Sequence, residues 1–193
     1  MTATFEDLAI DHANDSADLA EAEYSQNHNA FRSALNRLQT GMQRQSELLQ
    51  ALAPKDNSVG ELADRLGDQH LRGEQNLIVG LLGCGCEDGL AELDGQCRNA
   101  RQAQDGLHTL RTNRDNTVAF LTTFPGLAQS GGKLAKDLDQ HMAGLVKLIL
   151  VLKAAGPRSS KYKAAAKRFV DGTKKHGRFM DDALLPADSD ADC

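Results

Sequence analysis

The sequence predicts an all-α fold, an elongated antiparallel bundle of three long, kinked helices with a heptad pattern. Apolar residues recur at alternating steps of three and four along most of the 193-residue chain, which places them on one stripe of a helix. Aromatic residues make up only 4% and tryptophan is absent, a composition typical of helix seams built from leucine and alanine. Only one short run resembles a strand, so no sheet is expected.

The first predicted helix spans about residues 17–53. Two interleaved heptad rows run through this segment from Tyr24, and Pro54 with the polar residues after it ends the helix. At 1.5 Å per residue such a helix is about 55 Å long. Residues 1–16 are acidic with a short apolar patch, so we expect them to form an N-terminal arm ahead of the bundle, which covers 17–185.

The second predicted helix begins near Gly60 and loses its apolar phase between Gly67 and Gly89, a stretch rich in glycine. A strict heptad resumes at Leu90. Pro125-Gly126 and the glycines that follow predict the loop that ends this helix.

The third predicted helix covers about residues 133–184, because the alternation of threes and fours continues through Gly156-Pro157. A proline kinks a helix more often than it resets the apolar face, so one bent helix is expected. Two separate helices in this segment are the alternative. With such breaks the bundle would be read as four or five helices instead of three. The acidic tail, 186–193, is expected to be disordered. The seam residues, which we expect to support stability and dimerisation, include Phe31, Leu35, Leu38, Leu93, Leu107 and Leu145.

Three features favour a cytoplasmic protein, which could also associate peripherally with a membrane. The N-terminus lacks the basic start and apolar stretch of a secretory signal. The most apolar window, Met142–Leu152, is shorter than the twenty or so residues of a membrane span and contains Lys147. The four cysteines form no disulfide framework, which is typical of reduced thiols.

The run Leu77–Gly89 resembles a strand followed by the glycine loop of a nucleotide- or S-adenosylmethionine-binding enzyme. Such a loop needs a parallel sheet around it, and the rest of the sequence supplies no other strand. We therefore expect a close-packed, glycine-rich bend in a helix, and the enzyme that uses Gly80–Gly89 is a minor alternative.

The sequence offers no convincing metal site. Cys84 and Cys86 could join Cys97 and His108, but zinc sites usually show two pairs at matching spacing. A di-iron centre in a bundle needs Glu-x-x-His pairs, and the nearest approaches use aspartate, at Asp105 with His108 and Asp137 with His141. The histidines are interpreted as seam or surface residues. We expect no metal, no cofactor and no catalytic residue.

Charge is strongly segregated along the chain, and this is the main functional signal. The first 25 residues carry seven acids and no Lys or Arg, whereas the segment from Lys147 to Arg178 holds ten basic residues and one acid. An amphipathic basic helix suits an anionic lipid surface or an acidic protein partner. The absence of stacking aromatics argues against nucleic acid. Neutralisation by the acidic N-terminal residues or by the acidic tail is the alternative. The predicted binding face consists of Arg158, Lys161, Lys163, Lys167, Arg168, Lys174, Lys175 and Arg178.

The layout resembles a BAR domain, a family with three long antiparallel helices. The residues that carry the resemblance are the segments Gly60–Gly67, Leu90–Asp94 and Leu107–Asp115, and the match extends over about 17–184. It implies a curved dimer that binds membranes. Leu148–Tyr162 and its flanks are similar to vinculin- and talin-like adhesion bundles, which bind proteins.

These observations predict a non-enzymatic helical scaffold, a homodimer that meets an anionic membrane surface through its basic helix. The alternative is a protein-binding bundle or a coiled-coil adaptor subunit of a larger complex.

Overall fold

The computed structural model describes residues 3–83 and 98–185, and these residues confirm the all-α prediction. They form six α-helices and one short 3-10 helix, with no strand among them. The elements are α1 (Phe5–Tyr24), α2 (His28–Leu52), α3 (Ser58–Gly83), α4 (Arg98–Leu121), η2 (Pro125–Leu127), α5 (Gly131–Ala155) and α6 (Ser160–Leu184).

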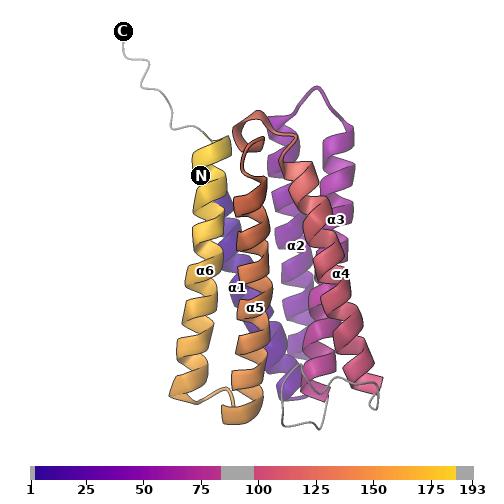
Figure 1. The fold of residues 1–193 in the computed structure, drawn as a ribbon. Helices are drawn as coiled ribbons and strands as arrows, with labels where there is room; N and C mark the ends of the chain where they lie inside the picture. The colour runs from indigo at the N-terminus through magenta and orange to yellow at the C-terminus, as the bar shows by residue number, and fades with distance from the viewer. Residues whose placement is uncertain (1–2, 84–97, 186–193) are drawn as a thin grey trace.

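The helices stand side by side in a closed bundle (Figure 1). Each helix packs against the next along the chain, and α6 packs against α1, so the six described helices form a ring. The odd-numbered helices α1, α3 and α5 also contact one another across the interior. Side chains on these three helices can therefore meet at the centre of the bundle.

The prediction of three long helices was wrong, because the described residues form six. Two of the three additional breaks are turns hidden inside continuous heptad patterns. The third separates α3 from α4, which pack against each other, and the residues that connect them lie outside the described ranges. The helix expected over 17–53 is divided after Tyr24, where Gln26 adopts a φ of 53° and the side chain of Asn27 caps α2. Asparagine side chains can satisfy the free N–H groups at the start of a helix, so this position favours a new helix over a continuous one.

The second hidden turn lies in the helix expected over 133–184. Gly156 has a φ of 74°, a left-handed conformation that glycine adopts without steric cost, and Ser159 caps α6 by accepting from the Tyr162 N–H. The alternative of two separate helices, α5 and α6, is thus the one observed.

Most of the acidic N-terminal arm expected over 1–16 is the first half of α1. Thr4 and Asp7 form a capping box, and Phe5 and Leu8 are buried in the bundle. The carboxylate of Asp181, near the end of α6, accepts hydrogen bonds from the Phe5 and Glu6 N–H groups at 2.7 and 2.8 Å. This start of the chain is therefore fixed to α6, whereas the acidic tail lies outside the described residues.

The seam residues mostly face the core of a single chain. Leu38 and Leu145 are buried, and Phe31, Leu35 and Leu107 are partly buried against the same apolar cluster. Leu93 lies outside the described residues. Because one chain encloses these side chains, they provide less apolar surface for a dimer than three separate long helices would.

The described part of the glycine-rich segment is helical and closely packed. Residues up to Gly83 belong to α3, and the remainder of Gly80–Gly89 lies outside the described residues. Glycines allow α3 and α4 to approach: a Cβ added to Gly106 would lie 2.5 Å from the backbone nitrogen of Leu77. Only a residue without a side chain fits at such a contact.

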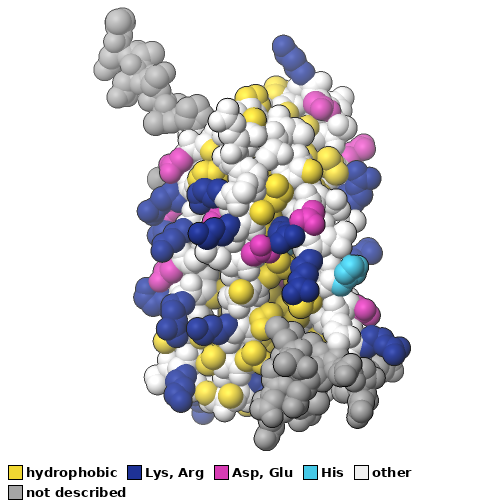
Figure 2. All heavy atoms as spheres, in the orientation of Figure 1, with side chains coloured by type: hydrophobic (Ala, Val, Ile, Leu, Met, Phe, Trp, Pro, Cys, Tyr) yellow, Lys and Arg dark blue, Asp and Glu magenta, His cyan; other side chains and the backbone are white. Residues whose placement is uncertain are grey.

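The surface of α6 carries many Lys and Arg side chains (Figure 2). None of the helices in the described ranges is both long and apolar enough to cross a membrane.

Candidate metal centre

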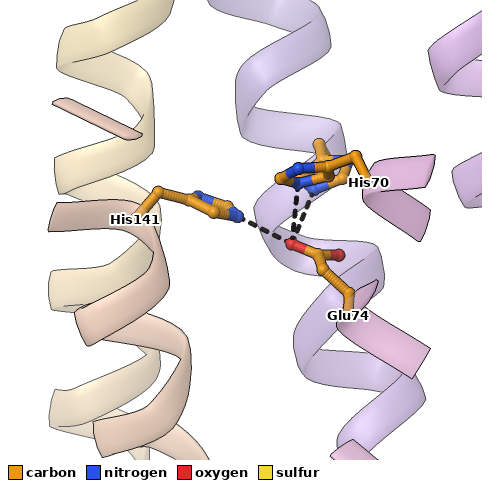
Figure 3. A group of neighbouring side chains, drawn as sticks. His70, Glu74 and His141 are labelled. Carbon is orange, nitrogen blue, oxygen red and sulfur yellow. Dashed lines mark hydrogen bonds and ion pairs between the residues drawn. The ribbon is translucent and has the colours of Figure 1, made fainter. Parts of the chain in front are cut away.

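Three histidines and one glutamate meet at the middle of the bundle. His12 comes from α1, His70 and Glu74 from α3, and His141 from α5, the three helices that contact one another across the interior. His70 and Glu74 are four residues apart, so they project from the same side of α3. His141 points across to Glu74 from the opposite helix (Figure 3).

The histidines converge on a single oxygen atom. The Nε2 atoms of His12, His70 and His141 lie 3.1, 3.1 and 2.7 Å from Oε1 of Glu74. The three imidazole rings have centroids 5.3 to 5.5 Å apart, and the four candidate ligand atoms lie within 4.8 Å of one another. Zinc bonds of 2.0–2.1 Å place tetrahedral ligand atoms about 3.4 Å apart. Small movements of the side chains would thus admit such an ion.

The centre is shielded from solvent. The side chain of Glu74 is 0% exposed, and those of His141, His12 and His70 are 9, 12 and 15% exposed. Ser16, one turn beyond His12 on α1, donates its hydroxyl to Oε2 of Glu74 at 3.0 Å. A carboxylate at this depth requires a compensating positive charge, because burial removes the hydration that stabilises it.

A hydrogen-bond chain favours one tautomer of His141. Thr173 on α6 donates its hydroxyl proton to the carbonyl of Phe169 at 3.0 Å, so its oxygen is left to accept from His141 Nδ1 at 3.1 Å. A neutral His141 with its proton on Nδ1 presents a lone pair at Nε2, directed at the Glu74 oxygen. Two such atoms at 2.7 Å need a proton or a cation between them, and metal-bound histidines typically donate their other N–H in this way.

Burial and neighbouring charges shift the pKa values of the side chains in the centre. Burial lowers the pKa of His141 to about 4, although the neighbouring Glu74 carboxylate favours its protonated form. For Glu74, burial raises the pKa, but the charges of His12 and His70 and the close contacts of His12 and His141 with its carboxylate hold it well below its usual range. Burial also opposes the charge on His12, yet Glu74 raises the pKa of that imidazole above its ordinary value. A buried His12–Glu74 ion pair is therefore the alternative to a bound metal.

The donor set indicates which ions could bind. Imidazole nitrogens suit zinc, iron, nickel and copper, whereas calcium and magnesium prefer sites built from oxygen atoms. Three imidazoles and one carboxylate can complete a four-coordinate shell around Zn²⁺.

This centre was not predicted from the sequence. The one local signal of it is the spacing of four between His70 and Glu74, while His12 and His141 lie 62 and 67 residues from Glu74 along the chain. Asp137, weighed as a partner of His141, instead binds Lys133 at 2.8 Å and His176 at 3.2 Å.

The other described candidates for metal binding do not join the centre. His108 is exposed on α4, and Asp105 beside it is exposed as well. Cys84, Cys86 and Cys97 lie outside the described residues.

The predicted basic face is divided into two flanks of α6. On the flank toward α1, Lys174 and Arg178 bind Glu6 at 3.2 and 2.9 Å, and these bonds, chiefly that from Arg178, lower the pKa of Glu6 to about 2. Lys167 on the same flank pairs with Asp171. Acidic residues of the chain therefore neutralise part of the face.

The flank toward α5 keeps its charges free of such contacts. Lys161, Arg168 and Lys175 repeat every seven residues, so they lie on one side of α6, and all three are exposed. No ion pair between described residues includes any of them. Lys163 and Arg158 are also exposed.

Comparison of the chain with protein-family models, with curated proteins and with solved structures gave no match.

Proposed function

We propose that this protein binds one divalent transition-metal ion, Zn²⁺ as first choice, through His12, His70, Glu74 and His141. The observation that carries the proposal is the convergence of three imidazole Nε2 atoms, from three different helices, on one buried carboxylate oxygen. An ion at this point would replace the shared hydrogen bonds by four metal–ligand bonds.

The consequence of binding would be a connection between α1, α3 and α5 inside the bundle. Such an ion binds the folded chain far better than the unfolded one, because only folding brings the four ligands together. The free energy of metal binding then adds to the free energy of unfolding. We therefore propose a helical bundle whose stability depends on the metal.

Metal titration of the chelator-treated protein tests this proposal. Isothermal titration calorimetry should give one Zn²⁺ per chain, and Co²⁺ should produce the intense visible absorption of a tetrahedral site. His141→Ala should weaken binding by at least about 100-fold, since loss of a residue that only orients a ligand already costs 10–100-fold. Thr173→Val, which removes such an orienting contact, should cost about 10–100-fold.

The matched control is His108→Ala, which removes an exposed histidine on α4 and should leave affinity unchanged. An affinity for Zn²⁺ and Co²⁺ that is the same in His141→Ala and in the unsubstituted protein would refute the centre. Failure of the unsubstituted protein to take up Zn²⁺, Co²⁺ or Fe²⁺ would favour the buried ion pair.

A second candidate function is association with an anionic membrane surface, through Lys161, Arg168 and Lys175. What supports it is the exposed flank of α6 on which these cations have no described acidic partner. Each cation held near an anionic bilayer contributes about 1 kcal/mol, and the attraction is screened within about 8 Å at physiological salt.

Co-sedimentation with phosphatidylserine vesicles tests this second function. Replacing all three cations by glutamate should abolish binding, whereas Lys174→Gln, which changes a cation already paired with Glu6, should have a smaller effect. If the triple variant sediments like the unsubstituted protein, the membrane proposal fails. An acidic protein partner then becomes the better hypothesis.

A further inference from the structure

A groove of about 140 Å³ lies between α5 and α6, two helices that stand side by side in the bundle (Figure 1). Two glycines on facing sides of these helices leave room for it. A Cβ added to Gly172 would meet no atom within 4 Å, and one added to Gly144 would meet only the ring of Phe169. The groove therefore exists because two positions on this pair of helices carry no side chain.

The groove is apolar at its base and positively charged at its rim. Leu148, Ala165 and Phe169 border it and are buried, so they form the base. Lys147 on α5 and Arg168 on α6 also border it, and both are exposed, so they lie at the rim. A molecule that fits both parts has a small apolar body and an anionic group at one end.

The two cations at the rim are not neutralised by the described part of the chain. No ion pair between described residues includes Lys147 or Arg168. Asp137 is a carboxylate that borders the groove, but it is already held by Lys133 at 2.8 Å and by His176 at 3.2 Å. Two positive charges at one rim repel each other, and an anion between them would offset that repulsion.

We infer that this groove binds a small organic phosphate monoester, with its phosphate between Lys147 and Arg168 and its apolar body against Leu148 and Phe169. A phosphate monoester carries a charge of about −1.5 to −2 at pH 7, which matches two cations better than the single charge of a carboxylate does. Arginine can bind phosphate through two parallel N–H groups, and lysine binds it as a point charge.

The volume of the groove sets the size of the apolar body. A cavity of about 150 Å³ can hold a benzene ring, so the body is a six-membered ring or an alkyl group of similar bulk. This site goes beyond both proposed functions, because it requires neither a metal ion nor a membrane.

Phenyl phosphate has the expected size and charge, and three related probes each differ from it in one respect. Inorganic phosphate lacks the ring, phenol lacks the charge, and benzoate carries one charge instead of about two. Binding is measured by calorimetry and chemical-shift perturbation on the full chain, without vesicles and after chelator treatment, which prevents the phosphate from binding a metal ion. Phenyl phosphate should bind at one site per chain, about tenfold more tightly than each of the other probes.

Substitutions of the cations test the rim. Lys147→Gln and Arg168→Gln should each weaken the binding of phenyl phosphate about tenfold, because each removes a charge-assisted contact. The matched control is the double variant Lys161→Gln, Lys175→Gln, which removes two exposed cations of α6 that do not border the groove. Its affinity should change by less than about twofold, since salt screens charges at that distance.

A glycine substitution tests the groove itself. Gly172→Leu fills the space without changing any charge, so it should abolish binding of phenyl phosphate. The control is Gly41→Leu on α2, where an added Cβ also meets no atom within 4 Å, and it should bind normally. Circular dichroism confirms that each variant is folded.

Binding of phenyl phosphate that survives in Gly172→Leu would overturn the inference, because charge alone would then explain it. A loss in the Lys161, Lys175 double variant as large as that in Arg168→Gln would overturn it for the same reason. Equal affinities for phenyl phosphate and benzoate would refute the choice of phosphate, and no binding of phenyl phosphate at millimolar concentration would refute the site. None of these outcomes depends on the metal centre, because the protein is tested without metal.

Discussion

The buried His141 should make the stability of the metal-free protein depend on pH in a defined direction. Its pKa is about 4 in the folded chain, against an ordinary value of 6.5. Between these values the unfolded chain binds more protons, so this residue makes the folded state less stable as the pH falls from about 6.5 toward about 4. The difference corresponds to about 3 kcal/mol at its limit, of which about 2 kcal/mol should be lost between about pH 7.5 and pH 5.

The measurement is the free energy of unfolding in urea, followed by circular dichroism over this pH range. His12 contributes in the opposite direction, because its raised pKa gives stability that is present below 6.5 and is lost as the pH rises through its folded value. The comparison of the unsubstituted protein with His141→Gln therefore isolates the effect. The variant should lose about 2 kcal/mol less on acidification. Identical pH profiles for the two proteins would refute the assignment.

Three further predictions concern packing and surface charge. Leu145→Ala should lower the free energy of unfolding by about 2–5 kcal/mol, because this side chain is fully buried. Denaturant titration measures that free energy. Gly106→Ala should destabilise the bundle by about 1–3 kcal/mol, because the added methyl group would push α3 away from α4. Gly172→Ala on α6 should stabilise the bundle by up to about 1 kcal/mol, because no atom lies near the added Cβ. A loss at both positions would contradict the close contact. Glu6→Gln should lower the melting temperature at neutral pH, and the difference should vanish as the pH falls from 4.5 toward about 2, where the carboxylate that binds Arg178 becomes protonated.

The helical class could be predicted from the sequence, but the number of helices could not. Heptad spacing shows that apolar residues lie on one side of a helix. The spacing continued without a change of phase across both hidden turns, so it gave no sign that a helix ended there. At the first turn the informative residue was Asn27, a good helix cap, and at the second it was the Gly156-Pro157 pair. In both cases local capping was a better guide than periodicity, because it concerns the backbone groups that a helix end leaves free.

The metal centre depends on contacts that no local pattern contains. His12 follows Asp11 in the acidic N-terminal segment and His141 occupies a heptad position, so each is indistinguishable from a surface or seam histidine until the ring of helices is known. Only the closure of α6 onto α1, and the contacts of α1, α3 and α5 across the interior, bring these residues to Glu74. The division of the basic face has the same origin, since Glu6 reaches Arg178 from 172 residues away in the chain.

Glu74 is the residue on which the two explanations of the centre differ. A buried carboxylate needs a compensating positive group, and in the ion-pair explanation one proton on His12 is sufficient. His70 and His141 would then add only hydrogen bonds to an oxygen that already has a charged partner. In the metal explanation each imidazole supplies one lone pair, and the contact between Thr173 and His141 Nδ1 leaves the lone pair on the nitrogen that faces the ion. The metal explanation thus gives a role to every described contact around Glu74, which is why we prefer it.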